Sequence, residues 1–246
     1  MPVFFITADQ LHEKTVAITG PLLDHLRASL RVKTGEQIWV GDERRQRYLV
    51  DVTHVDKRSL RGNVVKQRSG PAKTAPRILI GQSILKGERM DWAIQKSTEL
   101  GVDSIVPLVS EQTIVRPNRE RADAQQERWQ RIALEAAQQS ERWNVPIVGT
   151  SASATEFFAA PAKAALKLIL SERETGQGLA AIALPSSATD TIALAVGPEG
   201  GWRDEELAQA RAHGFLAVTL GTRILRAETA ALAAVSILQN RLGELG

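Results

Sequence analysis

Two glycine-bearing loops near the end of the chain hold the residues best suited to bind a small molecule. The first, 197–201, reads Gly-Pro-Glu-Gly-Gly and follows the apolar run 192–196. The second, 220–230, follows the apolar run 216–220 and leads into a helical pattern. Glycines at strand ends let the backbone approach a ligand closely, and the start of a helix offers unpaired N–H groups. Together the loops predict one site built largely from backbone, which favours a cofactor-dependent enzyme.

The side chains in these loops leave several roles open. Glu199 could cap a helix terminus or take part in polar recognition, and its spacing does not decide between the two. Arg226 and Glu228 are two residues apart, so on one helix they would point at different partners. Alternatively, Glu228 is favoured there only because a carboxylate stabilises the start of a helix. The first loop matches neither G-x-G-x-x-G nor a P-loop, which argues against a nucleotide-dependent dehydrogenase.

Three further polar segments are candidates for contact with a ligand. Lys86 and Arg89 lie at a predicted helix start, where they oppose the helix dipole and therefore suggest an anionic ligand. The basic run 44–47 lies beside a predicted hairpin turn, where it could touch phosphates or simply form an exposed loop. The polar residues 138–142 interrupt an apolar helix stripe, which indicates either a cavity wall or a helix end that leaves the core.

The composition excludes several classes of site. The chain has no cysteine, and its four histidines lack ligand spacing, so no metal site is expected. It has no run of 18 apolar residues and no signal-peptide pattern, which predicts a soluble cytoplasmic protein. Residues 1–73 carry 13 Lys and Arg against 8 Asp and Glu. This excess predicts a nucleic-acid partner or, alternatively, only a basic solvated surface.

The first third of the chain is predicted to form short strands. Strands are expected at 3–6, 37–41, 47–54 and 60–66, with one helix at 21–30. In the third strand, Tyr48, Val50 and Val52 share one face. Turn residues between the runs predict a small barrel or sandwich. The polar segment 67–76, which contains two prolines and a glycine, is expected to link two domains.

From Arg77 onward, apolar strands alternate with helical patterns. Strands are expected at 77–83, 104–110, 166–170, 192–196 and 216–220, and helices at 88–100, 122–143, 179–184, 204–213 and 228–242. Such alternation predicts a mostly parallel sheet covered by helices on both faces, with ligands at the carboxyl ends of the strands. The last helix has almost no polar face, which predicts a homodimer; a buried helix in a monomer is the alternative.

Taken together, five motifs resemble the bacterial small-subunit ribosomal RNA uridine-N3 methyltransferase family, which belongs to the SPOUT superfamily. They are the Gly-Pro-Glu-Gly-Gly loop, the Leu-Gly-x-x-Ile-Leu-Arg-x-Glu-Thr-Ala segment at 220–230, and the segments 86–101, 135–142 and 25–36. The chain departs from the family at Gln112, at Arg203 and near Phe4, where the family carries arginines. The resemblance covers nearly the whole chain.

The resemblance implies an α/β fold with two domains. Residues 77–246 would form a SPOUT-type trefoil-knotted parallel sheet with helices on both faces, and residues 1–70 a PUA-like β-barrel that binds RNA, with a linker at 71–76. The implied activity is methylation of N3 of a uridine in 16S ribosomal RNA, with S-adenosylmethionine as cofactor. Alternatives are another RNA substrate or a non-catalytic RNA-binding or assembly factor. The implied partners are ribosomal RNA and a second copy, bound through the C-terminal domain.

The resemblance also implies site residues. Arg226 or Arg142 would stabilise an N3 anion, and Glu199 or Glu228 would accept a proton or hold the cofactor. The residues expected around the cofactor are Leu170, Ser171, Glu172, Gly197, Pro198, Glu199, Gly200, Gly201, Leu220, Gly221, Ile224, Leu225, Arg226, Thr229 and Ala230. The residues expected to contact RNA are Arg31, Arg44, Arg45, Arg47, Lys86, Arg89, Gln139 and Arg142.

Overall fold

The computed structural model describes residues 3–116, 121–172 and 177–246. The chain forms two compact units. One comprises the chain up to Ala72 together with Ala137–Val145, and the other comprises Lys73–Ala136 and Pro146–Gly246. The expected domains were 1–70 and 77–246, with 71–76 between them. The segment Ala137–Val145, expected in the second domain, belongs to the first unit. Within the described ranges, no helix is both long and apolar enough to cross a membrane.

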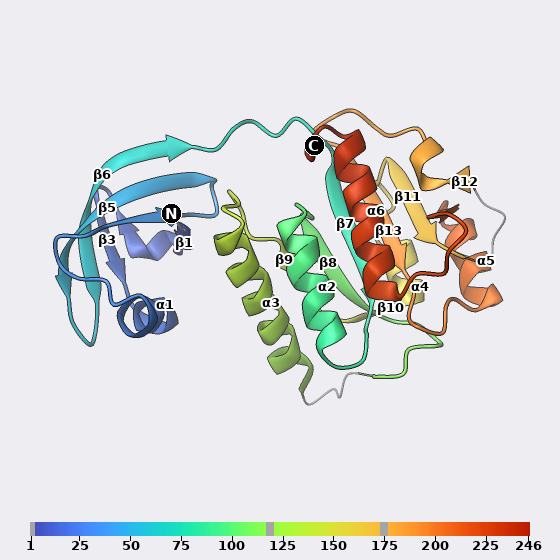
Figure 1. Ribbon diagram of the computed structural model, residues 1–246, viewed down its shortest axis with the longest axis horizontal. Coiled ribbons are helices and arrows are strands. Elements are labelled where there is room, and N and C mark those ends of the chain that lie inside the picture. Colours follow the sequence, from blue (N-terminus) through green and yellow to red (C-terminus); the bar gives the residue numbers. More distant parts are fainter. Residues whose placement is uncertain (1–2, 117–120, 173–176) are drawn as a thin grey trace. The chain divides into compact units, whose positions relative to one another are not determined.

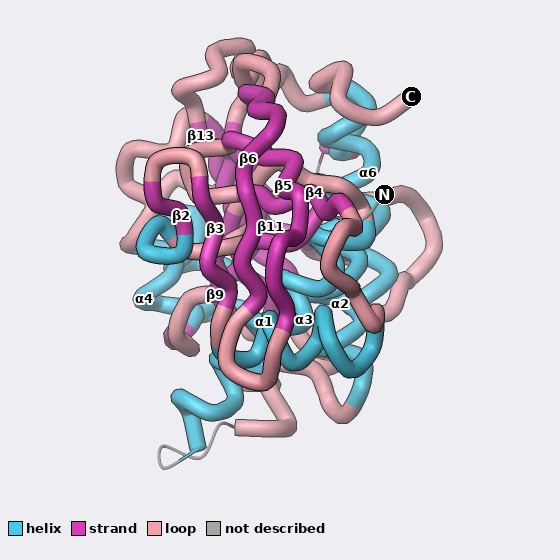
Figure 2. The backbone as a smooth tube through the Cα atoms, turned by 90° about the vertical axis from the view of Figure 1, so that its left-hand side faces the viewer, coloured by secondary structure: helices cyan, strands magenta, loops and turns pink. Residues whose placement is uncertain are grey.

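The first unit contains a six-stranded sheet in the order β1-β4-β5-β6-β3-β2. Its strands are β1 (Val3–Phe5), β2 (Leu11–His12), β3 (Thr15–Ile18), β4 (Gln37–Gly41), β5 (Gln46–Val55) and β6 (Leu60–Ser69). Among the strands that the structure describes in this sheet, β1 and β4 pair in parallel, and the other pairs are antiparallel. Figure 2 shows these strands curving side by side. Since β1 and β2 lie at opposite ends of the strand order, the sheet is an open half-barrel.

Period-2 alternation fixes the buried face of this sheet. Tyr48, Val50 and Val52 are buried, as their shared face predicts, whereas Leu49 and Asp51 are only partly covered. The expected helix at 21–30 is two pieces, α1 (Gly20–Asp24) and a π-helical turn, His25–Ser29. Strands β2 and β3 were not predicted.

The second unit is built on a sheet in the order β10-β8-β7-β13-β11-β14-β12, with β9 paired to β8. Its strands are β7 (Arg77–Ser83), β8 (Ser104–Val109), β9 (Ile147–Val148), β10 (Ala152–Ser153), β11 (Leu166–Leu170), β12 (Gln177–Gly178), β13 (Thr191–Val196) and β14 (Leu216–Thr219). Every pair in the described sheet is parallel, which confirms the predicted sheet type.

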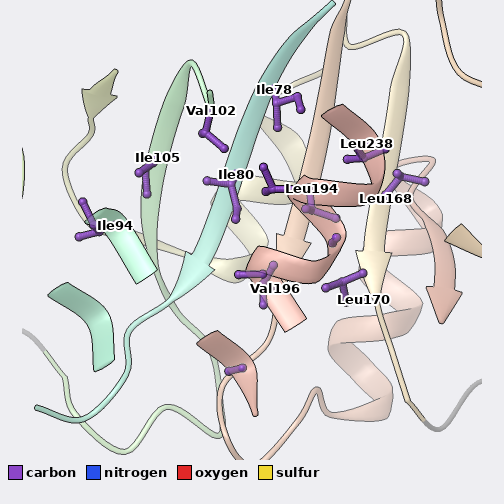
Figure 3. Packing of buried hydrophobic residues seen from close by; sticks show 14 of the residues in the cluster. Ile78, Ile80, Ile94, Val102, Ile105, Leu168, Leu170, Leu194, Val196 and Leu238 are labelled. Atoms are coloured by element: carbon purple, nitrogen blue, oxygen red, sulfur yellow. The ribbon is translucent and has the colours of Figure 1, made fainter. Parts of the chain in front are cut away.

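Helices cover both faces of this sheet, as expected. The helices are α2 (Glu88–Glu99), α3 (Ala122–Gln139), α4 (Ala154–Ala159), α5 (Asp204–Ala212) and α6 (Ala227–Arg241). Along β13, Ile192, Leu194 and Val196 pack into one core with residues of α2, α3 and α6 (Figure 3). Ala193 and Ala195 pack into a second core with residues of α4 and α5. The near-continuous apolar run of β13 therefore contributes side chains to two cores.

Helix α6 lies beside α2 in Figure 1, and its buried residues face the first of these cores. Ala231, Ala234, Val235 and Leu238 are buried there. Residues Leu232, Ala233, Ser236 and Ile237 are only half-buried within the described chain. The helix is thus apolar on its less covered side as well.

Several ends and short elements differ from the expectation. Helix α3 ends at Gln139 and not at 143, because Glu141 adopts a left-handed conformation (φ 52°) and the Arg142 N–H donates to the Ala137 carbonyl at 2.9 Å. This is a Schellman-type helix end with glutamate in the usual place of glycine. The segment expected as a helix at 179–184 is a single turn, Leu179–Ala181. The two-residue strands β9, β10 and β12 and the short α4 were not predicted.

Candidate cofactor site

A cavity of about 260 Å³ lies at the carboxyl ends of β11, β13 and β14. Parallel α/β sheets bind ligands at this edge. Three loops surround the cavity: 170–172 after β11, 196–202 after β13 and 218–230 after β14. The predicted cofactor residues that line it are Leu170, Ser171, Glu172, Gly197, Pro198, Glu199, Gly201, Leu220, Gly221, Ile224, Leu225, Arg226 and Ala230.

Two predicted cofactor residues lie outside this lining. Gly200 packs beside Gln112, since a Cβ on Gly200 would lie 3.0 Å from the Gln112 Cβ. Thr229 lines a separate hollow described below. Sequence reasoning assigned no role to several residues that do line the cavity, namely Val196, Trp202, Leu207, Val218, Thr219, Arg223 and Ala227.

The loop after β13 is shaped by a tight turn and by a tryptophan. The Gly201 N–H donates to the Pro198 carbonyl at 3.0 Å, and Gly201 has a φ of +75° that favours glycine. The Trp202 ring lies against Gly197, where an added Cβ would come 3.0 Å from Nε1. The same Nε1–H donates to the Leu170 carbonyl at 3.0 Å. Trp202 thereby fixes two of the three loops to each other.

Glu199 is held by the start of α2. Its Oε1 forms an ion pair with Arg89 Nη1 at 3.0 Å and lies 3.5 Å from the Lys86 N–H. Arg89 Nε in turn donates to the Lys86 carbonyl at 3.3 Å. Glu199 thus contacts the N-terminal end of α2 through both a side-chain cation and a backbone N–H. This carboxylate is consequently already occupied by a cation.

The helix that follows the glycine loop keeps half of a capping box. The Glu206 carboxylate, which is buried, accepts hydrogen bonds from the backbone N–H groups of Arg203 and Glu111, both at 3.0 Å. Arginine has no acceptor to complete the box. The carboxylate half of the cap is therefore retained despite the arginine at 203. The same Glu206 carboxylate ties the start of α5 to the segment after β8.

A second hollow lies at the starts of α2 and α6. It is lined by Glu88, Arg89, Trp92, Arg226, Glu228 and Thr229. Arg226 lines both this hollow and the cavity. Glu228 is 7% exposed, and its Oε2 has no hydrogen-bond partner. Trp92 is 43% exposed, which is high for a tryptophan.

The other predicted RNA residues, apart from Lys86 and Arg89, belong to the first unit. Arg44 is exposed, and Arg31 and Arg45 adopt left-handed backbone conformations (φ 54° and 58°). Gln139 is exposed and Arg142 is half-buried.

Arg47 is used inside the first unit. Its guanidinium lies 3.8 Å from the centre of the Trp143 ring, and Nη2 donates to the carbonyls of Glu141 and Arg142. Burial lowers the pKa of Arg47 from its usual value. Its contacts are therefore those of a structural residue that holds the segment after α3.

The cavity suits a cofactor bound through apolar and backbone contacts. Apolar side chains from all three loops line it, including Leu170, Val218 and Leu225. Two arginines, Arg223 and Arg226, add positive charge to this otherwise apolar lining. Among the described residues, no cluster of His, Cys, Asp and Glu could hold a metal ion.

Comparison with known proteins agrees with this architecture. A family model described as an RNA methyltransferase domain matches residues 73–239. A ribosomal RNA small subunit methyltransferase E from Synechocystis is 35% identical over 94% of this chain and 75% of its own length.

Two solved structures are similar over almost the whole chain. A ribosomal RNA small subunit methyltransferase E from Neisseria gonorrhoeae, bound to S-adenosylmethionine, is 37% identical with a TM-score of 0.87 and 98% of both chains covered. A putative methyltransferase from Legionella pneumophila, with bound S-adenosylmethionine, is 30% identical with a TM-score of 0.89 and 97% of both chains covered. The matched family model and the full-length likeness show that this chain belongs to the RNA methyltransferase family that contains the ribosomal RNA small subunit methyltransferase E proteins.

Proposed function

We propose that the protein transfers a methyl group from S-adenosylmethionine to N3 of a uridine in small-subunit (16S) ribosomal RNA. The observation that carries the proposal is the three-loop cavity at the carboxyl ends of β11, β13 and β14, in a chain of this family. A relative named for the small ribosomal subunit supports the class of RNA. Two similar solved structures that hold S-adenosylmethionine support the cofactor.

The cavity residues would hold the cofactor. S-adenosylmethionine supplies an electrophilic methyl group on a sulfonium. Leu170, Val218 and Leu225 offer apolar walls, while the 197–201 turn and Gly221 let backbone groups approach closely. Of the remaining predicted cofactor residues, Gly200 would act by shaping the loop that packs beside Gln112, and Thr229 would act from the adjoining hollow. The chief requirement is that the cofactor and the base be held in line.

The chemistry also needs a group that handles the N3 proton. Neutral uridine carries a proton on N3, so the enzyme must remove it and stabilise the resulting charge. Arg226, which lines the cavity, is suited to the second task, and Arg142 is a further candidate. Of the two carboxylates, Glu199 is paired with Arg89, whereas Glu228 has an unpaired oxygen. This difference favours Glu228 as the proton acceptor.

The first unit would hold the RNA. Its open sheet would act as a PUA-like barrel domain, joined by residues 71–76 to the methyltransferase domain. Arg44 is the clearest candidate for a phosphate contact because it is exposed. Arg31, Arg45, Gln139 and Arg142 are further candidates there, and Lys86 and Arg89 are candidates in the second unit.

The assembly is also part of the proposal. The half-buried apolar side of α6 supports a homodimer formed through the C-terminal domain. A trefoil knot in that domain and a cytoplasmic location are further expectations from family membership.

The test is transfer of labelled methyl groups from S-adenosylmethionine to small ribosomal subunits that lack the modification. The RNA is then digested and the methylated nucleoside identified by mass spectrometry, with large subunits as the control substrate. We expect 3-methyluridine from the small subunit alone. Transfer to a different nucleoside would overturn the N3 assignment, and cofactor binding without any transfer would favour a binding or assembly factor.

A further inference from the structure

The second hollow adjoins the cofactor cavity through two side chains. Arg226 lines both spaces. Glu199, which lines the cavity, is paired at 3.0 Å with Arg89, which lines the hollow. A molecule in the hollow would therefore lie next to one in the cavity, with Arg226 beside both. That is the relationship required between an acceptor base and a methyl donor.

Glu228 gives this hollow an unsatisfied acceptor. The side chain is 7% exposed, and Oε2 has no hydrogen-bond partner. Its place in the first turn of the 15-residue helix α6 stabilises its charge through the helix dipole. The dipole does not provide Oε2 with a donor, and an unpaired buried carboxylate oxygen is costly. Because the Glu228 side chain lines the hollow, its carboxylate is suited to a donor that arrives with a ligand.

Trp92 gives the same hollow an aromatic surface. It lies on α2 with Glu88 and Arg89, four and three residues before it, so the three share one face of the helix. Its indole is 43% exposed. An exposed indole is suited to stack on a nucleobase, as in the recognition of single-stranded RNA.

The polar groups in the hollow complement one edge of uracil. That edge presents O2 and O4 as acceptors on either side of the N3–H donor. Recognition needs an acceptor for N3–H and donors for the flanking oxygens, and the hollow offers the Glu228 carboxylate and the guanidinium groups of Arg89 and Arg226. Cytosine carries no proton on N3 and so offers no donor at that position. The groups in the hollow therefore match the N3 edge of uracil.

We propose that this hollow receives the extruded target uracil, with Trp92 stacked on the base and Glu228 as the acceptor of the N3 proton. The proposal rests on the proposed function and deepens it. Glu228 takes the proton from N3, the methyl group takes its place on N3, and the electron pair of the broken carbon–sulfur bond stays on sulfur. Glu228 then releases the proton to water. Arg226 stabilises the negative charge that develops on the base as the proton leaves.

The first experiment compares the wild type with Glu228→Gln, which keeps the size of the side chain but cannot take a proton. Both are assayed on unmodified small subunits and on subunits whose RNA contains 5-fluorouridine, which has a more acidic N3. We expect the variant to lose about 100-fold or more in kcat on the ordinary substrate. We expect most of this loss to be restored on the fluorinated substrate, while the calorimetric affinity for S-adenosylmethionine stays unchanged.

Three results would overturn the role of Glu228. One is near-wild-type activity of Glu228→Gln on the ordinary substrate. Another is an equal loss on both substrates, which would mean that the acidity of N3 is irrelevant to the defect. The third is loss of cofactor affinity, which would make Glu228 a residue of the cofactor site. If the wild type itself forms no 3-methyluridine, the proposed function fails and the inference falls with it.

The second experiment tests Trp92 by the affinity for unmodified small subunits, measured by filter binding without cofactor. We expect Trp92→Ala to weaken binding about 10-fold, in line with the loss of one stacked base, and Trp92→Phe to retain most of it. Unchanged affinity of Trp92→Ala would exclude stacking. A shift of Trp92→Ala toward monomer in light scattering would show that Trp92 lies in an interface between two copies, which would also overturn its stacking role.

Discussion

The indole N–H of Trp202 donates a hydrogen bond of 3.0 Å to the backbone carbonyl of Leu170. Leu170 ends β11, and Trp202 follows the glycine loop after β13, so the bond joins two walls of the cofactor cavity. Trp202 is 6% exposed and packs in the core between the sheet, α4 and α5. The shape of the cavity is therefore anchored to the core on the face opposite α6.

Trp202→Phe should weaken both folding and cofactor binding. The substitution keeps an aromatic ring but leaves the Leu170 carbonyl without its donor, which costs about 1–3 kcal/mol for a buried group. Thermal unfolding and calorimetric titration with S-adenosylmethionine measure the two effects. Trp129→Phe is the control, since Trp129 is equally buried but lies on α3. Equal cofactor affinity in the two variants would show that the bond to Leu170 does not shape the cavity.

Gly197→Ala should also weaken cofactor binding. The added Cβ would lie 3.0–3.3 Å from three atoms of the Trp202 ring, so either the ring or the loop must shift. We expect about a tenfold loss of affinity for S-adenosylmethionine, equivalent to about 1.4 kcal/mol. Gly178→Ala is a matched control because an added Cβ there meets no atom within 4 Å. Similar affinities for both variants would contradict the steric role of Gly197.

Much of the second unit could be predicted from sequence because its strands are buried on both faces. Such strands appear as apolar runs with clear ends, and the bounds of β7 and β11 agree with the expectation. The cavity could be located for a related reason. Parallel strands direct all their carboxyl ends to one edge, so loops after successive strands must meet there.

Contacts between distant residues could not be predicted. Arg89 and Glu199 are far apart in the chain, and no local pattern marks their pairing. Arg47 was expected to contact RNA, because a basic residue near a turn is usually exposed, yet its side chain contacts the segment 141–143. The end of α3 was misplaced because a glutamate, and not a glycine, adopts the left-handed conformation there.

Replacement of Arg47 should lower the free energy of unfolding more than replacement of Arg44. Arg47→Ala removes donors to two carbonyls and a cation–π contact, so the free energy of unfolding should fall by about 1–3 kcal/mol. Arg44→Ala, at an exposed site, should change it by less than about 0.5 kcal/mol. Urea unfolding measures both.

The same pair separates stability from RNA binding. If Arg44 contacts a phosphate, Arg44→Ala should flatten the salt dependence of RNA affinity by about one unit of slope. Joint replacement of Arg44 and Arg45, which leaves the contacts of Arg47 in place, should flatten it further. An unchanged slope in the double variant would remove these two arginines from the RNA-binding surface.

Glu156, in the first turn of α4, should make the free energy of unfolding depend on pH. Its carboxylate accepts hydrogen bonds from the Ser153 N–H at 2.7 Å and the Ser153 hydroxyl at 2.8 Å, which lower its pKa from the usual 4.5. Since the folded-state pKa is lowered, its stabilisation is present above the unfolded pKa and is lost as pH falls through the folded pKa. Glu156→Gln should therefore be less stable than wild type at neutral pH, and the gap should close in acid. A stability difference between wild type and Glu156→Gln that does not change with pH would show that the Glu156 carboxylate does not cause the pH dependence. As a control, the same difference measured in a Ser153→Ala background should depend less on pH.

The ion pair between Arg89 and Glu199 should be visible in cofactor affinity without RNA. It fixes the glycine loop to the start of α2, so Arg89→Gln and Glu199→Gln should each weaken binding of S-adenosylmethionine. If the two residues act through their mutual contact, the double variant should bind S-adenosylmethionine as well as the single variant with the lower affinity. Arg128→Gln is the control, because its ion pair with Asp91 joins α3 to α2 away from the loop. Strictly additive losses would mean that the two side chains act separately, and a loss that persists in high salt would exclude an electrostatic cause.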